Sequence, residues 1–191
     1  MSLYTDIETM DDGVISFTNF SLQNVKAYLN IYKTSLDSFG TEVGHHSIVL
    51  DVGNETTDEE HPIGLMVHLV IPKRDENQLV DCAVHRYNKK SDLLLRSIYL
   101  GIATFPNKVQ NLRELRTWFV KRFERQFIQE HCNGNFKWCS DTNCHKYSAF
   151  VVSQLGLEWP EGFKILNDYP SWTIDLVSFY RDTILSSHSS S

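Results

Sequence analysis

The sequence has no apolar run that approaches the ~18 residues needed for a membrane-spanning helix. Its first residues, 1–13, are acidic and lack the basic-then-apolar pattern of a secretory signal peptide. We therefore expect a protein without a transmembrane segment that resides in the cytoplasm.

Cysteine is scarce as well, and the few cysteines are irregularly spaced. They do not form the disulfide framework that is typical of a small secreted domain. In a reducing compartment, such cysteines serve as buried hydrophobes, metal ligands or nucleophiles. The 4 cysteines are Cys82, Cys132, Cys139 and Cys144.

An excess of positive charge is also absent, since 18 Lys and Arg residues stand against 24 Asp and Glu residues. Binding to a nucleic acid backbone requires a basic face, so we expect no nucleic acid partner. One basic cluster alternates with apolar residues between positions 112 and 125, and this pattern favours the solvated face of an amphipathic helix over an anion-binding patch. The cluster consists of Arg113, Arg116, Lys121, Arg122 and Arg125.

The chain does contain enough apolar residues to form a core, because 41% of its 191 residues are hydrophobic. We expect a flexible acidic lead over 1–12, a single catalytic-type domain over 13–185 and a disordered tail over 186–191. The sequence does not indicate an oligomeric state.

Apolar periodicity and turn signals predict the order of the elements. We expect strands over 14–20, 45–50, 65–71, 79–87 and 93–103. Helices are predicted over 22–39, 111–129, 144–155 and 173–185, with a polar, acidic loop over 51–62 between two of the strands.

Two short segments contain the residues that indicate a catalytic site. A histidine, His45, stands at the start of an apolar strand, and Cys144 stands where a buried helix begins, after residues of the helix-capping type. A helix N-terminus and a nearby imidazole both favour the thiolate, so the pair is typical of a cysteine nucleophile with its base. The structural alternative is that Cys144 only packs in the core and His45 belongs to a loop.

Other histidines and a zinc site are alternatives to this pair. His46 shares a strand face with Ile48, and a strand directs only one of His45 and His46 toward Cys144. We expect His145 to point away to the surface, and we find no functional argument for His85. Zinc is a further alternative for the segment 131–145, but its cysteines lack a close pair, so we expect no metal and no cofactor.

These segments resemble a known family. His-His-Ser-Ile-Val at 45–49 resembles the His-x-Ser-Ile-Val strand of the PPPDE peptidases, which have a permuted papain fold and include deSUMOylating isopeptidases. Asn-Cys-His-Lys-Tyr-Ser at 143–148 resembles their nucleophile segment. Weaker similarities lie at 99–104 and at 169–172.

A second group is similar almost to the same degree: the lecithin:retinol acyltransferase-like enzymes and other permuted relatives of NlpC/P60. In both groups the histidine corresponds to His45, which favours it over His46. The resemblance implies that Cys144 is the nucleophile, that His45 is the base and that His68, on the following strand, orients His45. The acidic insert 51–60 belongs to neither pattern. The resemblance therefore indicates the type of reaction more clearly than it indicates the substrate.

The resemblance implies an α+β fold of the permuted papain-like, NlpC/P60 type, with an antiparallel sheet packed against the nucleophile helix. We expect a cysteine-dependent hydrolase of peptide or isopeptide bonds, for instance in ubiquitin-like conjugates. Backbone amides at the start of the Cys144 helix, assisted by Asn143, would form the oxyanion hole. The alternatives are a lipid acyltransferase or thioesterase on the same fold and a non-catalytic binding or scaffold protein.

Overall fold

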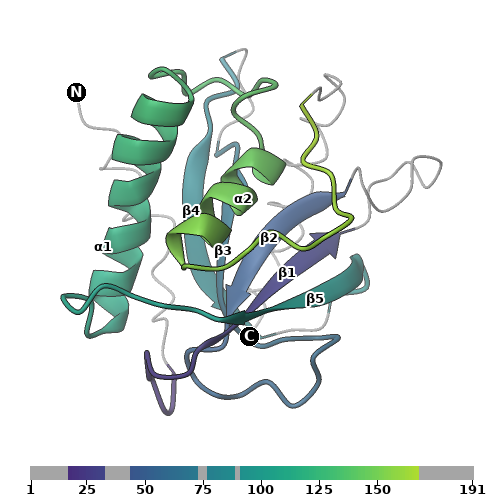
Figure 1. The fold of residues 1–191 in the computed structure, drawn as a ribbon, viewed down its shortest axis with the longest axis vertical. Helices are drawn as coiled ribbons and strands as arrows, with labels where there is room; N and C mark the ends of the chain where they lie inside the picture. The colour runs from purple at the N-terminus through teal and green to yellow at the C-terminus, as the bar shows by residue number, and fades with distance from the viewer. Residues whose placement is uncertain (1–16, 33–43, 73–76, 89–90, 168–191) are drawn as a thin grey trace.

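The computed structural model describes residues 17–32, 44–72, 77–88 and 91–167. In this part of the chain the fold is α+β, with a five-stranded antiparallel sheet, two α-helices and one π-helix (Figure 1). The predicted acidic lead over 1–12, the helix over 173–185 and the tail over 186–191 lie outside the described residues, as does the segment 169–172.

The strands lie in the order β4-β3-β2-β1-β5, and each neighbouring pair is antiparallel. The predictions of strands near 45–50, 65–71, 79–87 and 93–103 are confirmed, because each of these segments pairs in the sheet. The strands are β1 (Lys26–Tyr32), β2 (His45–Leu50), β3 (Gly64–Val70), β4 (Asp81–Tyr87) and β5 (Leu94–Ile102).

The predicted helix over 22–39 is wrong in its described part, where Lys26–Tyr32 forms strand β1. Apolar residues recur here at helical spacing, but they also alternate. Because β1 lies between β2 and β5, six of its seven residues are buried, and the contrast between a polar and an apolar face is lost. The predicted strand over 14–20 is also wrong at 17–20, which contains a turn.

The alternation of the strands gives the sheet two different faces. One face, which we call the helix face, carries aliphatic side chains such as Ile31, Ile48 and Val67, and it joins the main core with the helices. The opposite face, which we call the aromatic face, carries a smaller buried cluster. This cluster consists of Tyr28, Tyr32, Val49, Met66 and Tyr87.

The predicted amphipathic helix over 111–129 is confirmed as a helix, although its pitch changes along its length. α1 (Leu112–Arg122) begins at Asn111, whose side chain accepts a hydrogen bond from the backbone N–H of Glu114 at 2.9 Å. From Phe123 to His131 the chain continues as the π-helix η4. The apolar side of this whole helical segment, α1 and η4 together, packs into the main core. The basic side chains of the segment are exposed or half-buried.

The predicted helix at Cys144 is also confirmed, as α2 (Cys144–Gln154). It ends before Gly156, which adopts the left-handed conformation with φ of 70° that a glycine tolerates best. Figure 1 shows α2 lying over β2 and β3, and α1 standing beside β4. The first turn of α2 therefore lies against the central strands of the sheet.

Candidate active site

The start of α2 is held by Asn143, as the capping residues before Cys144 predicted. The side-chain oxygen of Asn143 accepts a hydrogen bond from the backbone N–H of Lys146 at 3.0 Å. Its Nδ2 donates to the carbonyl of Ser140 at 2.8 Å. Both ends of this buried amide thus fix the first turn of α2, and Asn143 supports the position of Cys144, which is 1% exposed.

The two segments singled out in the sequence meet at this point. His145 Nε2 donates a hydrogen bond to the carbonyl oxygen of Gly44 at 2.8 Å. The His145 ring also stacks on His46, with ring centroids 3.5 Å apart and planes inclined by 9°. The residue after Cys144 is therefore bonded to the residue before His45, which joins the start of α2 to the start of β2.

The prediction that His145 points to the surface is wrong, since its side chain is fully buried. His145 is buried because the start of α2 packs tightly against the start of β2. The pattern of apolar residues in α2 alone does not show this contact. Gly44 permits this approach because it has no side chain that would collide with the neighbouring strand β1. A Cβ atom at Gly44 would collide with the carbonyl oxygen of Tyr32 and would lie 2.8 Å from Cγ2 of Ile31.

His45 and His68 are in direct contact on the aromatic face. His45 Nε2 and His68 Nδ1 lie 2.9 Å apart, so one of these nitrogens donates a hydrogen bond to the other. Both side chains are buried, at 3% and 2% exposure. The structure therefore brings together the two histidines that the resemblance paired as base and orienting residue.

His46 lies on the other face of β2. It pairs with Ile31 across the strands, it shares the helix face with Ile48 as predicted, and its ring lies 6.0 Å from that of Trp159. Cys144 belongs to the main core on this same side. The start of β2 thus presents one imidazole on each face of the sheet, His46 on the face covered by α2 and His45 on the aromatic face.

The buried imidazoles are kept neutral. Burial, with a smaller contribution from the neighbouring His145, lowers the pKa of His45 to about 3. Burial also lowers the pKa of His145 to about 4, against the opposing effect of its hydrogen bond to the Gly44 carbonyl. The pKa values of His46 and His68 are likewise far below the usual range. At neutral pH His45 is therefore an uncharged imidazole.

His85 is the member of this region that sequence reasoning missed. Its ring packs against that of His68 on the aromatic face, with centroids 5.1 Å apart and an interplanar angle of 67°. In β4 and β3, His85 is directly opposite Met66, which is two residues before His68. The signal that could have found it is strand alternation, which gives His85 the same face as Tyr87.

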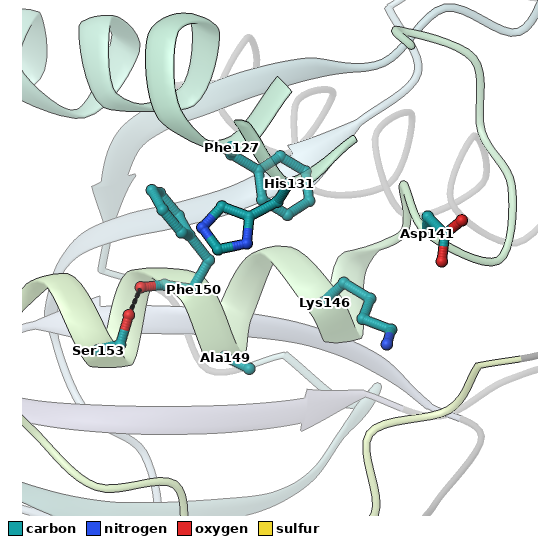
Figure 2. Close-up of a pocket in the computed structure, with 7 residues that line it drawn as sticks. All are labelled: Phe127, His131, Asp141, Lys146, Ala149, Phe150 and Ser153. Atoms are coloured by element: carbon teal, nitrogen blue, oxygen red, sulfur yellow. Dashed lines mark hydrogen bonds between the residues drawn. The ribbon is translucent and has the colours of Figure 1, made fainter. Parts of the chain in front are cut away.

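A pocket lies between η4 and α2, with a volume of about 270 Å³. Figure 2 shows the ring of His131 beside those of Phe127 and Phe150, with Lys146 and Asp141 further along the pocket. The other lining residues are Ala149 and Ser153, so its lining does not include Cys144, His45 or His68. The pocket is a separate feature from the thiol–imidazole region.

Potential metal ligands lie close together at one place among the described residues. The one group of three whose ligand atoms approach one another there is Asp58, Glu60 and His61 in the loop between β2 and β3. These side chains are mostly exposed. Two of them, His61 and Asp58, already contact each other at 2.9 Å. Among the helices of the described part, none has the length and apolar character needed to cross a bilayer.

Comparison with known proteins adds no relative. The chain matches no protein-family model, no curated protein and no solved structure.

Proposed function

We propose that the protein is a cysteine-dependent hydrolase that cleaves peptide or isopeptide bonds, with Cys144 as nucleophile, His45 as base and His68 as the residue that orients His45. The observation that carries this proposal is the hydrogen bond from His145 Nε2 to the Gly44 carbonyl at 2.8 Å. It connects the residues next to Cys144 and His45, which are a hundred positions apart in the sequence.

In the proposed reaction the Cys144 thiol transfers its proton to His45, whose Nε2 contacts His68. Because Cys144 packs on the helix face and His45 lies on the aromatic face, the transfer requires the start of β2 to turn His45 toward α2. The thiolate attacks the substrate carbonyl, and His45 returns the proton to the leaving amine. Water then hydrolyses the acyl-enzyme with His45 again as base. Backbone N–H groups at the start of α2 would bind the oxyanion, favoured by the positive end of the helix dipole.

The depressed pKa of His45 is compatible with this role. A neutral imidazole is the form that accepts a proton, and a thiolate formed beside it would raise the pKa of His45 again. The two groups would then titrate as a coupled pair.

We further propose that the antiparallel sheet and α2 form a permuted papain-like domain whose substrates are ubiquitin-like conjugates. Support comes from the resemblance of segments 45–49 and 143–148 to PPPDE peptidases, together with the antiparallel strand that carries the histidine and the helix that begins at the cysteine.

The proposal is tested with a ubiquitin-like protein that carries a thiol-reactive electrophile at its C-terminus, together with an acyl-lipid thioester of similar reactivity. Intact mass spectrometry of the full chain measures the adducts. We expect one adduct with the ubiquitin-like probe, lost in Cys144→Ser. Cys139→Ser is the matched control, since Cys139 is the most exposed cysteine, and it should leave the adduct intact.

Two results would contradict the proposal. An adduct with the lipid thioester but not with the protein probe would assign the site to acyl transfer on lipids. Equal, slow modification of all cysteines would make Cys144 a packing residue of a non-catalytic protein.

A further inference from the structure

The two edges of the sheet differ in how they are protected. β4 forms one edge, and none of its residues is exposed. α1 stands beside this strand, and Leu79, just before it, pairs with Lys137 (Figure 1). β5 forms the other edge, and in the described part of the chain no strand pairs with its outer side. Such an edge presents a row of backbone N–H and C=O groups that are able to bind a further strand.

β5 also carries the large apolar side chains that the described part of the molecule exposes. These are Leu95, Tyr99 and Ile102, which are 40%, 46% and 43% exposed, and all three belong to this one strand. The charged residue of β5 is Arg96, whose guanidinium lies 5.3 Å from the centre of the Phe163 ring. Natural edge strands are usually protected by several charges, by proline or by a covering element, so an apolar edge indicates an interaction site.

The middle of β5 is suited to pair with an identical strand. From Arg96 to Tyr99 the strand pairs regularly with β1, whereas the register shifts on both sides of this part. In an antiparallel pair, directly opposite residues point to the same face of the sheet. Two identical strands are then related by a twofold axis that passes beside one residue. With Ile98 at this axis, Ser97 of one copy is opposite Tyr99 of the other.

This register gives every exposed apolar side chain of β5 a suitable neighbour on the second copy. Bulky residues face small or apolar ones, and the opposite pairs are Tyr99 with Ser97, Leu95 with Gly101, and Ile102 with Leu94. Arg96 is opposite Leu100, so the two arginines of the pair do not face each other. The sequence of β5 is therefore complementary to itself in both size and charge.

We propose that the protein forms a homodimer in which β5 pairs antiparallel with β5 of a second copy, so that the two sheets join into one. The pairing provides partners for the backbone groups of both open edges, and it covers Leu95, Tyr99 and Ile102. Because the twofold axis is perpendicular to the joined sheet, the helices of both copies lie on the same side. β1 separates this interface from β2, so the inference does not depend on the proposed function.

The experiment is analytical ultracentrifugation of the full chain over a range of concentrations. We expect the wild type to sediment with twice the mass of one chain and to dissociate on dilution. Leu95→Lys and Tyr99→Lys place a charge within the strand pair and should each raise the dissociation constant at least tenfold, which is about 1.4 kcal/mol. Thr117→Lys is the matched control, because it adds the same charge on the exposed side of α1, and it should keep the dimer.

Hydrogen exchange locates the interface, since the amides of β5 should exchange more slowly at concentrations where the wild type is dimeric. The replaced side chains are largely exposed, so the single chain should fold in each variant, and circular dichroism verifies this. If one lysine variant does not fold, the other decides. A wild type that is monomeric up to about 1 mM would overturn the inference, even if β5 bound a strand of another protein. A dimer that survives both lysine substitutions, or that leaves the exchange of β5 unchanged, would also overturn it.

Discussion

At the scale of single residues, one contact joins two segments that are distant in the sequence. His145 donates to the Gly44 carbonyl and stacks on His46, and both histidines are buried. These two residues have different polar environments. In the described structure neither ring nitrogen of His46 has a hydrogen-bond partner, whereas His145 makes a specific bond.

This difference predicts opposite results for two similar substitutions. His145→Phe keeps the stacked ring but leaves the Gly44 carbonyl without this donor, which should lower the free energy of unfolding by about 2 kcal/mol. His46→Phe is the matched variant and should be neutral or stabilising, because it removes two buried nitrogens that lack partners. Urea denaturation of both variants measures the difference. A larger loss for His46→Phe would contradict the assignment of the bond to His145.

Gly44 gives a second prediction at this scale. Its missing side chain permits the start of β2 to lie against Tyr32 and Ile31. We expect Gly44→Ala to lower the free energy of unfolding by about 2 kcal/mol, because a collision with backbone cannot be relieved by rotation of a side chain. Gly162→Ala is a comparison, since nothing lies within 4 Å of a Cβ there, and its cost would come from φ of 82° alone. If thermal unfolding showed that Gly44→Ala is as stable as the wild type, the start of β2 would not lie this close to Tyr32 and Ile31.

At the scale of elements, strand alternation and capping signals predicted most of the described structure. β2 to β5, α1 and α2 all lie where the sequence indicates them, because the strands are short apolar runs between turn residues and the helices begin at a capping residue. β1 was not recognised, since a strand buried on both faces has apolar residues that also fit a helix. The change from α1 to the π-helix η4 at Phe123 has no signal in apolar periodicity.

The cap of α2 gives the prediction that belongs to this scale. Asn143→Ala removes both the bond to the Lys146 N–H and the bond to the Ser140 carbonyl. We expect a loss of about 1 kcal/mol in the free energy of unfolding, together with slower alkylation of Cys144. Asn111→Ala, which removes the equivalent cap of α1, is the control and should cost a similar amount without changing Cys144. A similar effect of both variants on Cys144 would contradict a local role of the Asn143 cap.

The candidate site was predictable only in part. The residue types and the capping pattern indicated Cys144, and the resemblance to known families indicated His45 and His68. The sequence did not predict that His145 is buried, because its environment comes from β2 rather than from its own helix. Strand alternation places His85 on the same face as Tyr87, but its contact with His68 depends on the register between β3 and β4, which the sequence does not give.

At the scale of the whole molecule, the buried imidazoles predict loss of stability in acid. The folded-state pKa values of His45 and His145, about 3 and about 4, lie below the ordinary value of 6.5. Between these values the unfolded chain binds more protons, so stability is full above pH ~7 and falls as the pH drops through 6.5 toward 4. His145 alone contributes on the order of 3 kcal/mol over this range.

Asp81 acts in the opposite direction, since burial raises the pKa of its carboxyl to about 6 and the folded protein then binds the extra proton. Four buried histidines outweigh this single carboxyl. Urea denaturation at pH 7.5 and at pH 5.0 measures the balance, and we expect a clearly lower midpoint at pH 5.0. Equal midpoints would mean that these histidines are not buried in the neutral form.

The central claim is that His45, assisted by His68, activates Cys144. Its most direct measurement is the pH dependence of Cys144 alkylation by iodoacetamide, followed by peptide mass spectrometry in the wild type, His45→Ala and His46→Ala. We predict a midpoint at least about one unit below the ~8.5 of an ordinary thiol in the wild type and in His46→Ala, and a return to ~8.5 in His45→Ala. A low midpoint that persists in His45→Ala, or that is lost only in His46→Ala, would contradict the account.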